Sequence, residues 1–186
     1  MKVNPELLPP LTVHGEPRVS IPQGEMVREM VRYLEDNVVS NRAYGFRQEK
    51  SCVMNLPSFY TQVNEGIKNR DDRVDAVYLD IKKACNRIPH KGLLRKLKHI
   101  GGLRGKVLEW MQDHLKNREM RTVIREVTLS WRNVTSGVPQ RSVLAPIMLL
   151  IYVNDMQCGV TSYMILFADD TKLMRIVKTT NDCQEL

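Results

Sequence analysis

The sequence predicts an α+β fold in which helices pack on one face of a small antiparallel sheet. Two observations indicate it: several segments carry apolar residues at helical spacing, and short β-branched or aromatic runs end in acids beside turn signals. At 186 residues the chain is one domain by length, and its 42% hydrophobic content is enough to form a core.

The N-terminal half is expected to hold an irregular segment, two helices and a strand. Residues 1–23 contain five of the nine prolines, so we expect an irregular segment there and one folded domain over residues 24–186. Helical spacing predicts a helix over residues 26–38, and residues 51–68 are also typical of a helix, which Pro57 would break or kink. The apolar run 74–79 predicts a buried strand that ends at Asp80.

The C-terminal half continues with helices and hairpins. Pro89 can open a helix that ends at the glycine pair 101–102, and residues 107–115 predict another helix. Residues 120–134 alternate as a β-hairpin does, and residues 143–156 have the composition of a buried helix. The final pattern is a strand over residues 163–167, an acidic turn, and a second strand.

Asp169 and Asp170, at that turn, are the most informative residues of the chain. Neighbouring side chains on a strand point to opposite faces, so two adjacent acids converge on one ligand only where the backbone turns. Such carboxylates repel each other unless a cation neutralises them, and hard oxygen ligands suit Mg²⁺. Adjacent acids also arise by chance, as at residues 35–36 and 71–72.

Asp80 adds a third acid at the end of another predicted strand. Three carboxylates from two strands can hold two divalent ions, which in phosphoryl transfer activate an attacking hydroxyl and stabilise a leaving pyrophosphate. Sequence spacing leaves an alternative open, in which Asp80 caps the turn after its strand.

Four segments carry a family resemblance: residues 44–47 (YGFR), residues 77–90 (VYLDIKKACNRIPH), residues 137–146 (GVPQRSVLAP) with 151–155 (IYVND), and residues 167–173 (FADDTKL). In this order they resemble the motifs of reverse transcriptases from non-LTR (LINE-type, jockey-like) retrotransposons. The resemblance implies a palm-like sheet with incomplete fingers and no thumb over residues 24–186. The remaining polymerase parts and an endonuclease are expected in the full-length element protein.

The resemblance also implies roles for individual residues. The catalytic, metal-binding carboxylates would be Asp80, Asp169 and Asp170, with two Mg²⁺ expected and Mn²⁺ as a possible substitute. The nucleotide-binding positions would be Ile81, through its carbonyl, Cys85, Gln140 and Arg47. The reaction implied is RNA-directed DNA polymerisation, in which the hydroxyl of a DNA primer on an RNA template attacks a deoxynucleotide triphosphate.

The chain departs from the family pattern at several motif positions. Cys85 stands where the family has a bulky aromatic residue, which predicts poor discrimination against ribonucleotides. Asn86 replaces an Asp, Lys82 replaces a Ser, and Ala145 replaces a Gly. Arg141 replaces another Gly, a residue that permits backbone angles disfavoured by a Cβ, and its long side chain is predicted to fill the nucleotide pocket.

Charge and cysteine spacing narrow the choice of partners and compartment. The net charge of +7 favours an anionic partner such as nucleic acid, although the basic residues are as well explained by solvated helix faces. The four cysteines lack zinc or disulfide spacing, and no apolar run has the length of a membrane span or a signal-peptide core. We therefore expect an intracellular protein, nuclear or cytoplasmic and not secreted, with reduced thiols and no membrane partner.

Three functional hypotheses stay open at this point. The first is a working polymerase core. The second is a catalytically inactive relic that at most binds nucleic acid nonspecifically, and the third is a remnant without a stable fold.

Overall fold

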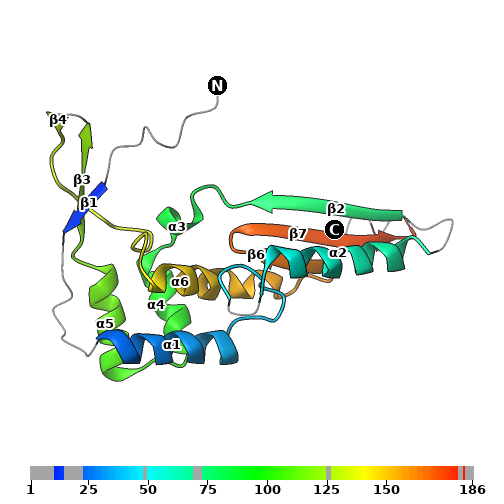
Figure 1. The fold of residues 1–186 in the computed structure, drawn as a ribbon, viewed down its shortest axis with the longest axis horizontal. Helices are drawn as coiled ribbons and strands as arrows, with labels where there is room; N and C mark the ends of the chain where they lie inside the picture. The colour runs from blue at the N-terminus through cyan, green and yellow to red at the C-terminus, as the bar shows by residue number, and fades with distance from the viewer. Residues whose placement is uncertain are drawn as a thin grey trace.

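The computed structural model describes residues 11–14, 23–47, 50–68, 73–124, 127–179 and 182. The described elements form a layer of helices and two antiparallel sheets (Figure 1). The predicted α+β class is therefore confirmed. None of the helices in these ranges is both long and apolar enough to cross a bilayer.

One sheet is three-stranded and antiparallel, in the order β2-β7-β6. Its strands are β2 (Arg73–Asp80), β6 (Tyr163–Phe167) and β7 (Asp170–Val177), of which β2 and β7 are the longest strands described. β2 pairs with β7 along its whole length, from Arg73 opposite Val177 to Asp80 opposite Asp170. β6 and β7 form a hairpin closed by Ala168 and Asp169, so the predicted sequence of strand, acidic turn and strand is confirmed.

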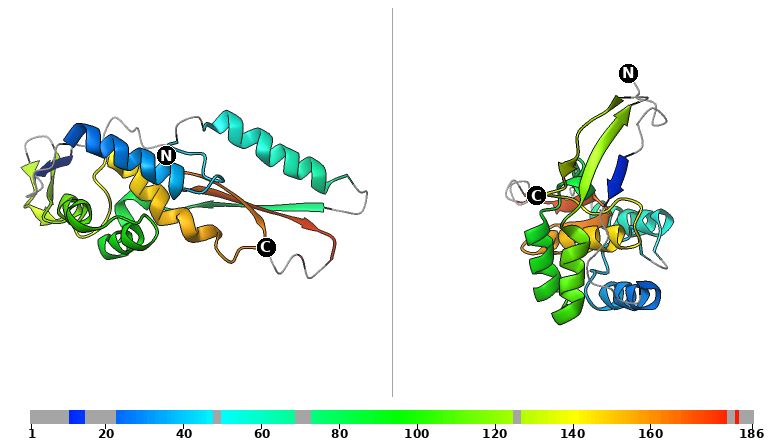
Figure 2. Two further views of the ribbon diagram at one scale, coloured as in Figure 1. Left: turned by 90° about the horizontal axis from the view of Figure 1, so that it is seen from below. Right: turned by 90° about the vertical axis from the view of Figure 1, so that its left-hand side faces the viewer.

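β2 is an edge strand, which corrects the prediction that it would be buried. Tyr78 is 65% exposed and Leu79 is 43% exposed. The apolar run predicted the strand correctly, but burial depends on the layers around it. The helix α2 (Cys52–Gly66) runs along one face of the sheet and contacts β2 and β6 (Figure 2). Pro57 lies inside α2 without ending it.

Four further helices enclose the main hydrophobic core. They are α1 (Gln23–Asn37), α4 (His90–His99), α5 (Gly105–Leu115) and α6 (Leu144–Val153), and a short helix, α3 (Ala84–Arg87), precedes α4. α6 is apolar on all sides, and eight of its ten residues are buried. Met164, Leu166 and Leu173 of the sheet pack into the same core. The helix predicted over residues 143–156 is buried only as far as Val153, because a 3₁₀ helix with no buried residue, Asn154–Gln157, follows α6.

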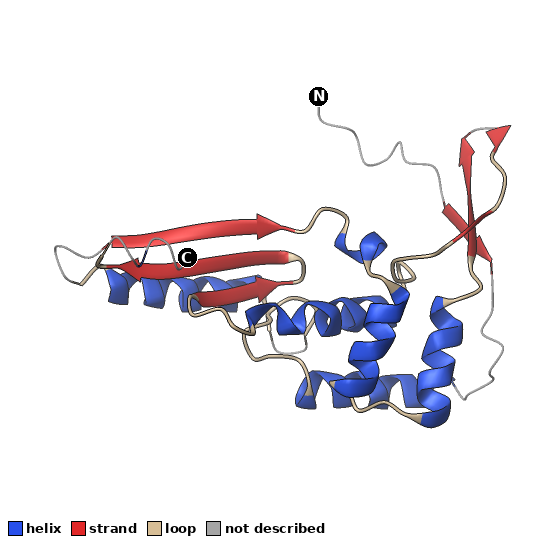
Figure 3. Cartoon of the chain, turned by 180° about the vertical axis from the view of Figure 1, so that it is seen from behind, coloured by secondary structure: helices blue, strands red, loops and turns tan. Residues whose placement is uncertain are grey.

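A second sheet projects beyond the helices (Figure 3). Its central strand, β3 (Glu119–Ile124), pairs with β4 (Val127–Thr128) and β5 (Arg132–Asn133), as the predicted hairpin required. β3 also pairs with β1 (Leu11–His14), which lies within the segment expected to be irregular. The rest of residues 1–22 lies outside the described residues, as does Cys183, while Cys85 and Cys158 are free thiols.

Candidate carboxylate site

Asp80, Asp169 and Asp170 meet at one end of the three-stranded sheet. Asp80 ends β2 and is the antiparallel partner of Asp170, the first residue of β7. Directly opposite residues of such a pair have Cβ atoms roughly 4.5–5.5 Å apart on one face of the sheet. Asp169 lies in the adjoining turn. The fold thus brings all three acids to one place, while their catalytic role stays a prediction.

The turn that carries Asp169 is packed against the segment of residues 44–47. Ala168 is buried and has a φ of 58°, a left-handed value common in tight hairpin turns. A Cβ added to Gly45 would lie 2.4 Å from the backbone nitrogen of Ala168. Because only glycine allows so close an approach, the glycine of this motif has a direct packing role at the acidic turn.

Residues 42–44 reach the turn by extending the sheet beyond β6. The backbone nitrogen of Leu166 donates to the carbonyl of Arg42 at 3.0 Å, and the nitrogen of Tyr44 donates to the carbonyl of Leu166 at 2.9 Å. These bonds determine where Gly45 meets Ala168.

Asn154 holds the chain that leads into this extension, and sequence reasoning did not single it out. Its Oδ1 accepts a hydrogen bond from the backbone nitrogen of Ser40 at 2.7 Å. Its Nδ2 donates to the carbonyl of Val38 at 2.9 Å. The only sequence signal was its place in the motif of residues 151–155, so we regard Asn154 as a positioning residue.

The loop after Asp80 is held by the motif of residues 137–140. The nitrogen of Val138 donates to the carbonyl of Cys85 at 2.8 Å. Gly137 has a φ of 81°, and a Cβ there would lie 2.7 Å from the same carbonyl. Gln140 Nε2 donates to Asn86 Oδ1 at 2.7 Å. The second and third motifs therefore form one packed unit.

Cys85 lies within the electrostatic reach of the acidic turn. Burial raises the pKa of its thiol, and the Asp169 carboxylate raises it further, because a nearby negative charge disfavours the thiolate. The thiol thus lies within electrostatic range of the Asp169 carboxylate, while its role as a nucleotide-binding position stays a prediction.

Ile81 and Arg47 both have structural partners. The carbonyl of Ile81 accepts a bond from the nitrogen of Ala84 at 3.0 Å, and a carbonyl oxygen has a second lone pair to offer. Arg47 donates to the carbonyls of Ser40 and Glu35, at 3.0 and 3.2 Å, which ties it to the C-terminal part of α1. Nucleotide contacts by either residue stay predictions.

Arg141 has a strained backbone at a family glycine position. Its φ is 60°, and its side chain is exposed. The left-handed conformation explains why glycine suits this position.

The end of the sheet that carries Asp80 and Asp170 has some of the features of a divalent-cation site. No three His, Cys, Asp or Glu side chains in the described ranges are arranged as a metal-binding group. Asp80 and Asp170 are nevertheless like charges placed directly opposite each other, which destabilises a strand pair unless a cation lies between them. Their oxygens are the ligands that Mg²⁺ prefers.

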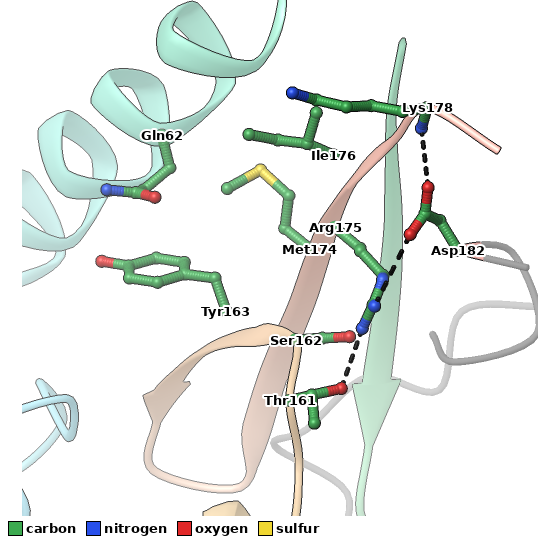
Figure 4. Close-up of a pocket in the computed structure, with 9 residues that line it drawn as sticks. All are labelled: Gln62, Thr161, Ser162, Tyr163, Met174, Arg175, Ile176, Lys178 and Asp182. Atoms are coloured by element: carbon green, nitrogen blue, oxygen red, sulfur yellow. Dashed lines mark hydrogen bonds and ion pairs between the residues drawn. The ribbon is translucent and has the colours of Figure 1, made fainter. Parts of the chain in front are cut away.

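A pocket of about 410 Å³ lies at the other end of the β6–β7 hairpin (Figure 4). Within it, Arg175 donates to Thr161 Oγ1 at 2.8 Å and pairs with Asp182 at 3.7 Å. Hydrogen bonds from the backbone nitrogens of Lys178 and Thr179 lower the pKa of Asp182. None of the predicted site residues lines this pocket.

Comparisons with known proteins identify the family of this chain. The family described as reverse transcriptase (RNA-dependent DNA polymerase) matches residues 15–185. The chain is 24% identical over 159 residues to a probable RNA-directed DNA polymerase from transposon BS of Drosophila melanogaster, covering 81% of this chain and 17% of that protein. It is 28% identical over 113 residues to the RNA-directed DNA polymerase from mobile element jockey of the same species, covering 61% and 12%.

The fold is similar to that of an apo telomerase from Candida tropicalis. The TM-score is 0.60 at 11% identity, and the match covers 87% of this chain and 34% of the telomerase chain. At this identity the likeness concerns the fold alone. Since the family match spans almost the whole sequence and includes all four motifs, the chain belongs to the reverse transcriptase family, and its resemblance to the non-LTR, jockey-like branch is confirmed.

Proposed function

We propose that this chain carries the carboxylate centre of an RNA-directed DNA polymerase of the non-LTR retrotransposon type. The observation that carries the proposal is the pairing of Asp80 with Asp170 beside the turn that holds Asp169. Two Mg²⁺ ions, when bound to such carboxylates, supply activation of a primer hydroxyl and stabilisation of a leaving pyrophosphate. Mn²⁺ is expected to substitute for Mg²⁺.

The surrounding residues would orient the incoming nucleotide. Gln140, held by Asn86, would lie beside it, and the Ile81 carbonyl has a free lone pair at the same loop. Cys85 is smaller than the aromatic residue of the family and would leave room for a ribose 2′-hydroxyl. Arg47 would reach the triphosphate only by leaving its present bonds to the end of α1.

The substrates and the setting follow from the same proposal. They would be an RNA template, a DNA primer and deoxynucleotide triphosphates, used inside the cell in the nucleus or cytoplasm. The chain spans 12–17% of the length of the two transposon relatives named above, and we assign the remaining polymerase parts and an endonuclease to the same full-length element protein.

A second candidate is a catalytically inactive relic that binds nucleic acid nonspecifically. It is favoured by Arg141, which puts a long cationic side chain and a strained backbone at a glycine position of the motif. The net charge of +7 is compatible with either candidate.

Primer extension separates the two candidates. The purified chain is given a DNA primer on an RNA template with deoxynucleotides and Mg²⁺, beside an Asp169→Asn variant and, as a matched control, Asp113→Asn on α5. The polymerase would be supported if the wild type and the Asp113→Asn variant extend the primer and the Asp169→Asn variant does not. A chain that unfolds cooperatively but extends nothing, and binds nucleic acid equally well with Asp169→Asn, would support the relic. A missing unfolding transition would indicate a remnant without a stable fold.

A further inference from the structure

A second pocket, of about 560 Å³, lies where three segments meet: the end of α3 with the start of α4, the loop between α5 and β3, and the residues that follow β5. We call it the basic pocket, because its lining includes Arg87, His90, Lys91, Lys116 and Arg118 and no acidic residue. Its volume is in the range of pockets that bind small ligands.

The floor of the basic pocket contains a buried guanidinium. Arg118 is 8% exposed and donates to the carbonyls of Leu115 and Gly137 at 3.2 and 3.1 Å. His90 Nε2 forms a 2.8 Å hydrogen bond with the same Gly137 carbonyl. Both partners of Arg118 are neutral carbonyls, and within the described ranges no ion pair brings it a carboxylate.

The rim of the basic pocket carries three exposed cations. They are Arg87, Lys91 and Lys116, and none of the ion pairs found among the described residues involves them. Burial lowers the pKa of His90, the hydrogen bond with the Gly137 carbonyl raises it, and the charges of Arg118 and Lys116 lower it, because both cations impose a positive field on the imidazole. An anion would relieve this field.

The position of the basic pocket connects it with the carboxylate site. Arg87 ends α3, the short helix that follows Asp80 in the chain. Gly137, whose carbonyl His90 and Arg118 share, belongs to the motif that packs on the same segment. The lining also offers hydroxyl and amide groups, on Thr135, Ser136 and two asparagines. Arginine, lysine, serine, threonine and asparagine are the side chains that contact nucleic-acid phosphates.

We infer that the basic pocket binds the sugar-phosphate backbone of a nucleic-acid strand, with Arg87, Lys91 and Lys116 as the phosphate contacts. The inference rests on the proposed function, since the bound nucleic acid would be a template or primer strand that continues from the carboxylate site into the basic pocket. Binding through phosphates alone is independent of base sequence and weakens steeply with salt.

The test is the salt dependence of oligonucleotide binding. Fluorescence anisotropy with a labelled single-stranded RNA of mixed sequence is measured over a KCl series, without Mg²⁺ or nucleotides. The pocket variant is the triple substitution Arg87→Gln, Lys91→Gln and Lys116→Gln. The control triple, Lys98→Gln, Arg104→Gln and Lys106→Gln, removes the same charge from exposed residues at the other end of the α4–α5 pair. That end is roughly 15 Å away along a ten-residue helix.

The pocket triple should weaken binding and reduce the slope of log K against log salt by about 2, at roughly 0.7 for each single-strand phosphate that the protein no longer neutralises. The control triple should keep the wild-type slope. Equal changes in both triples, no change in the pocket triple, or a wild-type chain that binds no RNA would overturn the inference. If the pocket triple does not unfold cooperatively, the single variants Lys91→Gln and Lys116→Gln decide the question, each with an expected slope change of about 0.7.

The design also separates this inference from the proposed function. If the wild type extends no primer, but the pocket triple alone shows a smaller slope of log K against log salt, the proposed polymerase is refuted and nucleic-acid binding at the basic pocket is supported. If Asp169→Asn abolishes extension while both triples bind RNA with the same salt dependence, the proposed polymerase is supported and binding at the basic pocket is refuted.

Discussion

Replacement of Arg141 by glycine should stabilise the fold. Arg141 holds a φ of 60°, where a residue with a Cβ is disfavoured by roughly 1–2 kcal/mol. Glycine adopts this conformation freely, but it adds roughly 0.4–1 kcal/mol of chain entropy to the unfolded state. The exposed Arg141 side chain has no hydrogen bond or ion pair with the described residues, so its removal loses little. The centres of these two ranges, about 1.5 and 0.7 kcal/mol, leave a gain of about 0.8 kcal/mol.

Urea unfolding followed by circular dichroism measures this gain. With an m value of about 2 kcal/mol/M, the midpoint of Arg141→Gly should rise by about 0.4 M. The control is Arg104→Gly, because Arg104 has a φ of −141° that any residue adopts. Its midpoint should stay the same or fall. A lower midpoint for Arg141→Gly, or an equal rise in both variants, would refute the strain argument.

The same variant tests the nucleotide pocket. If the Arg141 side chain fills this pocket, Arg141→Gly should increase nucleotide incorporation by an extending form of the protein. Unchanged nucleotide affinity would contradict the prediction that the Arg141 side chain fills the pocket. It would leave the argument about backbone strain unaffected.

Three further predictions concern the supports of the site and the pH dependence of stability. Gly45→Ala puts a Cβ 2.4 Å from the backbone nitrogen of Ala168, so the free energy of unfolding in urea should fall by about 1–3 kcal/mol; an unchanged midpoint would show that the turn relaxes freely. Asn154→Ala leaves the Ser40 nitrogen without its partner and should cost about 1–3 kcal/mol in the same assay, whereas a loss below that range would mean that water replaces the bond. The folded-state pKa of His90 lies below its unfolded value, so the unfolded chain binds more protons and stability should fall as the pH drops from about 6.5 through the folded pKa. His90→Gln should flatten that slope in urea titrations at several pH values, and equal slopes would contradict the assignment to His90.

Local patterns predicted the elements that depend on neighbours along the chain. The hairpin around Asp169 and the helix that follows Pro89 both follow from hydrophobic periodicity and turn residues, which act over a few positions. The order of four motifs predicted the reverse transcriptase family, and the family match confirms it.

Interactions between distant segments escaped prediction because no local pattern encodes them. Periodicity predicted a strand at residues 74–79 but could not tell that β2 lies at a sheet edge, because exposure depends on the other layers. β1 was expected as irregular chain, since only its pairing with β3 makes it a strand.

The sequence by itself determined most of the element types, the family and the three candidate acids, because these reside in local composition and motif order. Only the tertiary structure decided that Asp80 faces Asp170 and that Gly45 lies flush against the acidic turn. It also gathered the cations of the basic pocket from two separate segments, residues 87–91 and 116–118. The physical reason is that strand register and chain packing are settled by long-range hydrogen bonds and close packing, which form only when the whole chain folds.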